Sequence, residues 1–167
     1  MPIGSLTKKT SNKIPPRVSL VEMTQQVLPG DTNAHGTVFG GKVMQWIDIA
    51  GAVCAMRHAR EMVVTASFDR VDFHAPAKVG HVMVLKAHVN YTGKTSLEVG
   101  VEVLAENPLT GDRLLTTEAL ITYVAIDKKG KPTSIRQLLP ETEDEMRRFQ
   151  QGEQRRADRK RSQSNKR

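Results

Sequence analysis

The sequence predicts an α+β fold in which an antiparallel sheet wraps around one buried helix. Two observations carry this prediction. In residues 43–56 only Gln45 and Asp48 are polar, so a helix formed by this stretch must be buried on nearly all sides. Four strand-like segments then follow with no helical pattern between them. A doubly wound α/β fold needs helices between its strands, so the order of these segments excludes it.

The segments before the helix are short. Order is expected to begin near Val18, where a short strand leads to Leu28 and ends at the turn residues 29–31. A glycine-rich loop, residues 33–41, then leads into a helix of roughly 17 residues. The polar residues 57–61 mark its exit to solvent, and their cations suit a helix C-terminus.

The strands after the helix are predicted from alternation of apolar and polar residues. In residues 64–75 the apolar positions change from even to odd near Asp69 and Arg70, which predicts a β-bulge there. Residues 85–91 and 97–103 alternate on either side of a Thr-Gly-Lys turn and predict a hairpin. Residues 115–126 are the last long strand, and residues 141–160 predict a charged, weakly amphipathic helix.

Length and charge indicate one domain with basic ends. A chain of 167 residues fits a single core, which we divide into a disordered lead (1–17), the folded domain (18–140) and a charged helix with a disordered tail (141–167). The net charge is +7, with +4 in residues 1–17 and +6 in residues 155–167, so residues 18–154 carry −3. Charge confined to the ends, with 4% aromatic residues, argues against a dedicated nucleic-acid groove.

Other features concern location and cysteine chemistry. The sequence has neither a membrane-spanning apolar run nor a secretory signal, which predicts a cytoplasmic protein. Cys54 is the single cysteine, so it forms no internal disulfide and no cysteine metal cluster. Its place in the apolar helix predicts inert packing in a reducing compartment.

The loop before the helix carries a recognisable pattern. Residues 31–41, followed by Asp48, resemble the cytosolic acyl-CoA hydrolase group of the hot-dog-fold thioesterases. Residues 64–69, 73–76 and 92–99 resemble the same group, so the likeness covers about residues 18–126. The resemblance implies hydrolysis of an acyl-CoA to a free fatty acid and CoA, with no metal or redox cofactor. It also implies a homodimer, further assembled as a trimer of dimers (a hexamer), in which Asn33 of one subunit faces Asp48 of the other.

Asp48 is the leading candidate for the catalytic carboxylate. A carboxylate on a helix that is buried on nearly all faces is costly unless something compensates it. A hydrogen bond to a loop or a buried ion pair would explain it without catalysis. In the family, the acid at this position acts as general base or nucleophile, and the sequence leaves both roles open.

Gly40 and Gly41 precede the helix, where free amides and the positive end of the helix dipole would stabilise a thioester oxyanion. A tight turn would require the same glycines without catalysis. Gly41 lies about two turns before Asp48, on a similar face of the helix. Asn33 is implied to be functional by the resemblance, although an Asn after a turn is also a common cap or turn residue.

His35 leaves alternatives open. It is assigned to substrate binding, although it could instead orient the loop, and its unperturbed pKa near 6.5 suits a general base. Paired with Asp48, it keeps a hydroxyacyl dehydratase as a rival function. A second rival, an acyl-CoA sensor that regulates transcription, would need a DNA-binding module, and the 17-residue lead is too short for one.

Recognition of CoA requires cations and hydrogen-bond donors for its phosphates. The resemblance implies anchors near a turn of the sheet, and other basic residues are weaker candidates. These positions are Gly93, Lys94 and Ser96, followed by Arg57, His58 and Arg70. Each basic residue taken singly is equally expected of solvated surface.

Overall fold

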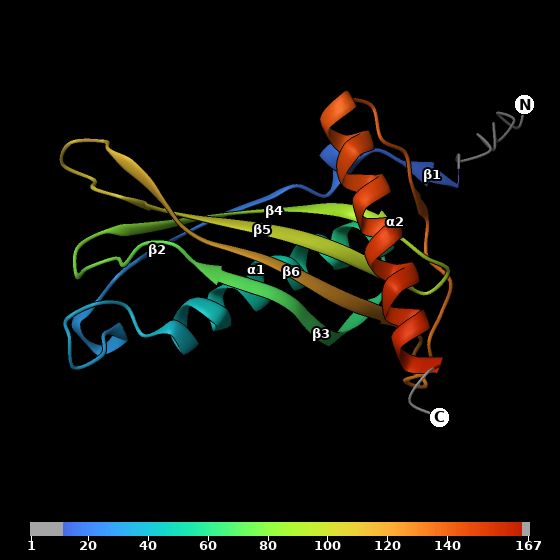
Figure 1. The fold of residues 1–167 in the computed structure, drawn as a ribbon, viewed down its shortest axis with the longest axis horizontal. Helices are drawn as coiled ribbons and strands as arrows, with labels where there is room; N and C mark the ends of the chain where they lie inside the picture. Colours follow the sequence, from blue (N-terminus) through green and yellow to red (C-terminus); the bar gives the residue numbers. More distant parts are fainter. Residues whose placement is uncertain (1–11, 165–167) are drawn as a thin grey trace, which may run out of the picture.

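Figure 1 shows the computed structural model of the chain, which describes residues 12–164. Its elements in chain order are β1 (Lys13–Ile14), η1 (Pro16–Val18), β2 (Val21–Gln26), η2 (Pro29–Asp31), α1 (Gly40–Ala59), β3 (Met62–Phe73), β4 (Val82–Thr92), β5 (Ser96–Glu106), β6 (Arg113–Ile126), β7 (Gln137–Leu138) and α2 (Glu143–Ser164). Four basic residues of the predicted lead and tail lie outside the described residues: Lys8, Lys9, Lys166 and Arg167.

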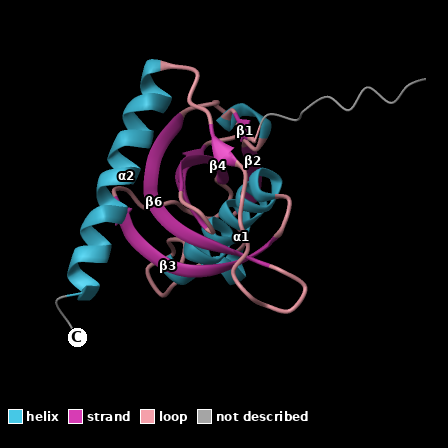
Figure 2. Cartoon of the chain, turned by 90° about the vertical axis from the view of Figure 1, so that its right-hand side faces the viewer, coloured by secondary structure: helices cyan, strands magenta, loops and turns pink. Residues whose placement is uncertain are grey.

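Five strands form one antiparallel sheet in the order β2-β4-β5-β6-β3. The sheet curves around α1, as seen along the strands in Figure 2. The side chains that β4 and β5 direct toward the helix are nearly all apolar and almost fully buried: Met83, Leu85, Ala87, Val89, Leu97, Val99, Val101 and Val103. The predicted α+β fold with a central helix, the hot-dog arrangement, is therefore confirmed.

The central helix α1 is longer than predicted, because it begins at Gly40 and continues to Ala59. Its buried residues recur every three or four positions and form one broad face toward the sheet. Gln45 and Ile49, on the opposite face, are exposed, so the predicted burial on nearly all sides is wrong for a single chain. The helix ends at Arg60, whose φ of 57° is left-handed and whose N–H donates to Met56 O at 2.8 Å. A left-handed residue at this point is a common helix C-terminus.

The bulge predicted near Asp69 and Arg70 is confirmed, but the predicted inward position of Val64 is wrong, because Val64 is exposed and a second, unpredicted shift precedes the bulge. The pairing of β3 with β6 shifts register between Thr65 and Ser67 and again between Phe68 and Arg70. Each shift turns the following side chains to the other face of the sheet. As a result, Thr65 lies on the helix side of the sheet, whereas Asp69 lies on the outer side with the neighbouring Thr122.

The ends of the folded part are more ordered than predicted. Lys13–Ile14, expected in the disordered lead, pairs in parallel with Gln137–Leu138. Helix α2 reaches Ser164 and lies on the outer face of the sheet, opposite α1 (Figure 2). In residues 12–164 no helix is both long and apolar enough to cross a membrane.

Candidate active site

Asp48 lies half-buried on α1 and faces the strand pair β3–β6. Its Oδ1 accepts a hydrogen bond from Thr65 Oγ1 at 2.8 Å. The hydroxyl of Tyr123 lies 3.2 Å from the same Oδ1 and 3.1 Å from the backbone carbonyl oxygen of Asp48. Within residues 12–164 no hydrogen bond or ion pair reaches Asp48 Oδ2. The expected carboxylate is thus oriented by two hydroxyls, and its second oxygen remains available.

The N-terminus of α1 also presents free donors. Lys42 and Val43 donate their N–H groups to Phe39 O at 2.9 Å and 3.2 Å. The amides of Gly40 and Gly41 have no acceptor among residues 12–164. Such amides, at the positive end of the helix dipole, can stabilise a developing oxyanion.

Both glycines at the start of α1 meet aromatic rings. A Cβ on Gly41 would lie 2.5 Å from Phe39 Cε1, and one on Gly40 would lie 3.6 Å from Phe73 Cζ. A side chain at position 41 would therefore meet the Phe39 ring, which is exposed and would have to move. Neither Gly40 nor Gly41 has a positive φ, so no left-handed turn requires glycine at these positions.

An apolar cavity of ≈ 320 Å³ opens beside this helix end. Gly40 and Val43 of α1 line one side of it, and Phe73, Ala77 and Met83 line the other. Its lining is mainly apolar, as an acyl chain would require.

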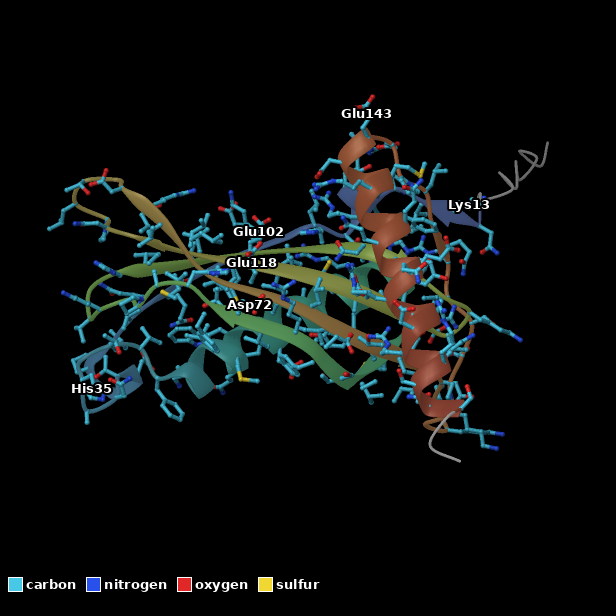
Figure 3. The ribbon with its side chains drawn as sticks, in the orientation of Figure 1. Lys13, His35, Asp72, Glu102, Glu118 and Glu143 are labelled. Carbon is cyan, nitrogen blue, oxygen red and sulfur yellow. The ribbon has the colours of Figure 1, made fainter. Side chains whose placement is uncertain are left out.

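The loop before α1 is closed by Asn33. Its Nδ2 donates to Thr37 Oγ1 at 3.1 Å, and its Oδ1 accepts from the N–H of His35 at 2.9 Å. Asn33 makes no contact with Asp48 in the same chain, and the exposed His35 lies at the end of the molecule opposite α2 (Figure 3). The structure of one chain therefore does not bring Asn33 or His35 to Asp48.

The three residues expected to anchor CoA at the β4–β5 turn differ in their exposure to solvent. Gly93 is buried beneath the Arg156 guanidinium, where a Cβ would lie 2.5 Å from Cζ, and its carbonyl accepts from Gln137 Nε2 at 2.9 Å. Lys94 is exposed, and Ser96 is half-buried at the start of β5. Of these three residues Lys94 alone carries a cation, and no ion pair reaches it from residues 12–164.

The weaker anchors are engaged elsewhere. Arg57 Nη1 donates to Leu20 O at 2.8 Å, and Arg70 pairs with Asp72 on the outer face of the sheet. His58 is fully buried, with Nε2 3.1 Å from Arg136 O. Burial lowers the pKa of His58 to about 4, so its imidazole is neutral at pH 7. The expectation of His58 as a phosphate anchor is therefore wrong in this structure, because the ring is neither charged nor accessible.

A second cavity, of ≈ 340 Å³, lies on the outer face of the sheet beneath α2. Charged residues line it, among them Asp72, Glu102 and Glu118, which stand side by side on neighbouring strands (Figure 3). No residue of α1 lines this cavity. It is therefore separate from Asp48 and from the amides at the start of α1.

The described part of the chain has neither a metal-binding cluster nor a reactive thiol. Residues 12–164 contain no group of three or more His, Cys, Asp or Glu side chains that could hold a metal ion. Cys54 is buried in α1, and desolvation raises the pKa of its thiol to about 12. A thiol in this state is a poor nucleophile at neutral pH.

Thr65 and Tyr123 are the contacts of Asp48 that sequence reasoning missed. Thr65 is one of several hydroxyl residues in an alternating strand, and Tyr123 occupies an apolar position of the last strand. The alternation gave a signal only for Tyr123, which lies on the inward phase of its strand, whereas Thr65 falls on the predicted outward phase and faces the helix because of the register shift between Thr65 and Ser67. Their meeting at Asp48 follows from the register of β3 with β6, in which Thr65 and Tyr123 are direct partners.

Comparison with known proteins agrees with this architecture. Residues 35–111 match the family described as the thioesterase superfamily. A Bacillus subtilis protein named an acyl-CoA thioester hydrolase is 43% identical over 128 residues, covering 77% of this chain and 74% of that protein. The cytosolic acyl coenzyme A thioester hydrolase of Mus musculus is 34% identical over 153 residues. This match covers 89% of this chain but 40% of the mouse protein, so the chain spans less than half of that relative.

Solved structures are also similar. A hexameric acyl-CoA thioesterase in its apo form has a TM-score of 0.86 and 47% identity, covering 90% of this chain and 96% of that one. An acyl-CoA hydrolase from Staphylococcus aureus, solved with butyryl coenzyme A and coenzyme A, has a TM-score of 0.82 and 36% identity, covering 92% and 96%.

Alanine variants of the S. aureus enzyme have been solved at an aspartate, a threonine and an asparagine. In that enzyme the threonine follows the aspartate by 17 residues and the asparagine precedes it by 15. The same two spacings separate Asp48 from Thr65 and from Asn33 in this chain. With its fold, its matched segment and these relatives, the chain belongs to the thioesterase superfamily, among the hot-dog-fold acyl-CoA thioester hydrolases.

Proposed function

We propose that this protein hydrolyses acyl-CoA thioesters to a free fatty acid and CoA, and that Asp48 activates the attacking water. The observation that carries the proposal is the carboxylate of Asp48 on an otherwise apolar helix, held at Oδ1 by Thr65 and without a partner at Oδ2 among residues 12–164. A carboxylate oxygen within hydrogen-bond reach of water can serve as a general base. The S. aureus relative solved with butyryl coenzyme A supports the substrate class.

The proposed reaction has two steps. Asp48 Oδ2 takes a proton from water as the water oxygen bonds to the thioester carbon, which gives a tetrahedral oxyanion. The C–S bond then breaks, the carbonyl re-forms, and Asp48 returns the proton to the leaving thiolate of CoA. Amides at the start of α1 would stabilise the oxyanion, and one lost donor of this kind costs about 100-fold to 1000-fold in rate.

A site shared between two subunits follows from the distance along α1. Gly41 and Asp48 are two helical turns apart, about 10 Å along the axis, so one thioester carbon cannot touch both within a single chain. Asn33, at the same end as Gly41, also makes no contact with Asp48. We therefore assign each site to the amides and Asn33 of one subunit and to Asp48 of its partner.

The flank formed by α1 and β3 suits this dimer. Strand β3 is an edge of the sheet, so one side of its backbone is free to pair with another strand. Exposed apolar side chains lie on this flank: Phe39, Ile49, Met62, Val64 and Phe73. A second copy that pairs along β3 would cover them. Hexameric relatives support further assembly of such dimers into a trimer of dimers.

The remaining assignments are more general. The apolar cavity beside Gly40 would take the acyl chain, and the exposed cation of Lys94 at the β4–β5 turn would contact the phosphates of CoA. The mammalian relatives are named cytosolic hydrolases, in keeping with a cytoplasmic protein. No metal or redox cofactor is part of the proposal.

The test is release of free thiol from acyl-CoAs of two to eighteen carbons, by the wild type and by Asp48→Asn. The variant keeps the size of the side chain but loses its basicity, so kcat should fall about 100-fold to 10,000-fold with little change in KM. Asp158→Asn, on the exposed face of α2, is the matched control and should keep wild-type kcat. If Asp48→Asn kept more than about a third of kcat, Asp48 would supply less than about 1 kcal/mol of the barrier and the proposal would fail.

A single turnover in ¹⁸O-labelled water would distinguish Asp48 as a general base from Asp48 as a nucleophile, by the position of the label in the products. A general base delivers the label to the fatty acid only. A nucleophile forms an acyl anhydride with Asp48, and attack of water on the Asp48 carbon of that anhydride would leave the label in the protein. Label in the protein would therefore replace the general-base step by a covalent one.

A further inference from the structure

The hydroxyl of Tyr123 reaches α1 through a gap that only glycine leaves. Tyr123 is fully buried on β6 and faces the helix. A Cβ on Gly51 would overlap the Tyr123 hydroxyl and would lie 3.2 Å from its ring atoms Cε2 and Cζ. Glycine weakens a helix relative to alanine, so its presence in the middle of α1 is explained by this approach.

The two hydroxyls at Asp48 come from one pair of facing residues. Thr65 and Tyr123 are direct partners in the antiparallel pairing of β3 with β6. Thr65 Oγ1 lies 2.8 Å and the Tyr123 hydroxyl 3.2 Å from Asp48 Oδ1. Because the sheet fixes their spacing, they contact the carboxylate as one rigid unit.

This arrangement distinguishes the two oxygens of Asp48. Oδ1 has both hydroxyls beside it, whereas Oδ2 has no partner within residues 12–164. The Tyr123 hydroxyl also lies 3.1 Å from Asp48 O, so it spans the side chain and the backbone of the same residue. Contacts of this kind hold a side chain in one rotamer.

Tyr123 must remain protonated to donate. Burial and the neighbouring Asp48 raise the pKa of Tyr123 well above its ordinary value of 10. Its hydroxyl therefore stays a donor through the whole range of pH in which the enzyme would work.

We infer that Tyr123 is a positioning residue for the reaction, which acts through Asp48 and depends on the space left by Gly51. The inference rests on the proposed function, because it requires Asp48 to do the chemistry. Tyr123 holds Oδ1 so that Oδ2 points at the water. It does not touch the substrate, so its loss should affect kcat and leave KM nearly unchanged.

The first test is Tyr123→Phe, which keeps the ring and removes the hydroxyl. Misplacing a catalytic group by about 1 Å can cost on the order of 100-fold, so kcat should fall about 10-fold to 100-fold with KM within about twofold. Tyr91→Phe is the matched control. The Tyr91 hydroxyl lies beside Arg156 rather than Asp48, so this variant should keep wild-type kcat.

The second test separates positioning from general destabilisation. Adding Tyr123→Phe to Asp48→Asn should cause no further loss of kcat, because the group that Tyr123 positions is already inactive. Gly51→Ala should displace the hydroxyl and reproduce the Tyr123→Phe loss, and the two together should be no worse than Tyr123→Phe alone. Sedimentation and thermal melting would verify that each variant assembles and folds.

Two results would overturn the inference: Tyr123→Phe keeps more than half of the wild-type kcat, or its loss multiplies fully with that of Asp48→Asn. If Asp48→Asn is inactive, either result would leave the proposed function intact and would overturn only the positioning role of Tyr123. Activity in Asp48→Asn itself would instead overturn the proposed function.

Discussion

Arg155 of α2 forms a two-fold hydrogen-bonded ion pair with the buried Glu98 of β5, with Nε 2.9 Å from Oε2 and Nη2 2.6 Å from Oε1. The Glu98 side chain is 1% exposed and that of Arg155 is 33% exposed. Asn90 Nδ2 donates to Glu98 Oε1 at 3.1 Å. This pair, together with the ring contact of Phe149 with Tyr91, attaches α2 to the outer face of the sheet.

Removal of Arg155 should therefore be costly. Arg155→Met leaves Glu98 charged and buried, and breaking such a pair typically costs about 3 to 5 kcal/mol. We expect the low end of this range in the free energy of unfolding, because Asn90 still donates to Glu98. Arg161→Met is the matched control. Its pair with Asp158 is exposed, so its loss should cost less than about 1 kcal/mol.

Urea unfolding at one fixed protein concentration would measure both costs, since assembly also contributes to stability. Adding Glu98→Gln to Arg155→Met should recover part of the loss, because the unpaired buried charge is then gone. Equal costs for Arg155→Met and Arg161→Met would contradict the attachment of α2 through Glu98.

The last turns of α2 should also contribute. Arg159 pairs with Asp69, whose carboxylate accepts hydrogen bonds from Ser67 and Thr122. Deleting residues 157–167 removes this pair, and we expect a loss of about 1 to 3 kcal/mol in the free energy of unfolding. Deleting only residues 165–167 is the control and should cost little. Thermal melting of the two truncated proteins with Arg159→Ala would check this, and full stability after the longer deletion would show that Arg159 is dispensable.

The docking of α2 could not be predicted from its sequence pattern. An amphipathic helix is recognised by an apolar stripe, whereas α2 packs through the single ring of Phe149, two arginines and the small Gly152. A Cβ on Gly152 would lie 2.6 Å from Tyr91 Cβ, so the helix approaches the sheet closely at this point. Charged residues and a glycine in sequence are also typical of solvated segments, and so the tail was predicted to be disordered beyond the helix.

The central helix and the strands were predictable because their signals are local. Asp48 was found for the same reason, as the single acid within an apolar helical stretch. Thr65 and Tyr123 were missed because they meet Asp48 only through the pairing of two distant strands. A bulge could be placed near Asp69 from the change of phase, but the partner of each residue across the sheet could not.

Stability should fall with acidity because of two histidines, the buried His58 and the half-buried His88. Burial lowers the pKa of His58 and of His88 to about 4, with smaller contributions from the charges of Arg136 and Arg148 respectively. In the unfolded chain both titrate near 6.5, so between pH 6.5 and 4 the unfolded state binds more protons. Their contribution is fully present above pH 6.5 and is lost as the pH falls toward 4, by up to about 1.4 kcal/mol per pH unit for each histidine.

Urea unfolding at pH 7, 6 and 5 would measure this slope before most carboxylates begin to titrate. His88→Gln should remove about half of it, and His58→Gln a similar share. A free energy of unfolding that stays constant from pH 7 to pH 5 in the wild type would show that these histidines are protonated in the folded protein.

A shared site predicts that two inactive variants restore each other. In a two-fold symmetric dimer, subunits with Asp48→Asn and subunits with Asn33→Ala combine to give one site with both substitutions and one site with neither. The intact site takes Asp48 from one subunit and Asn33 from the other. Random mixing makes about half of the dimers hybrids with one working site of two, so activity should return to about one quarter of the wild-type value.

The measurement is thiol release after the two variants are unfolded in urea together and refolded by dilution. Each variant refolded alone is the control and should stay inactive, which excludes recovery by refolding itself. A mixture that remains as inactive as its parts would mean that Asp48 and Asn33 serve the same chain. Since Gly41 and Asp48 are two turns apart on α1, that result would also separate the amides from the carboxylate and require a different oxyanion donor.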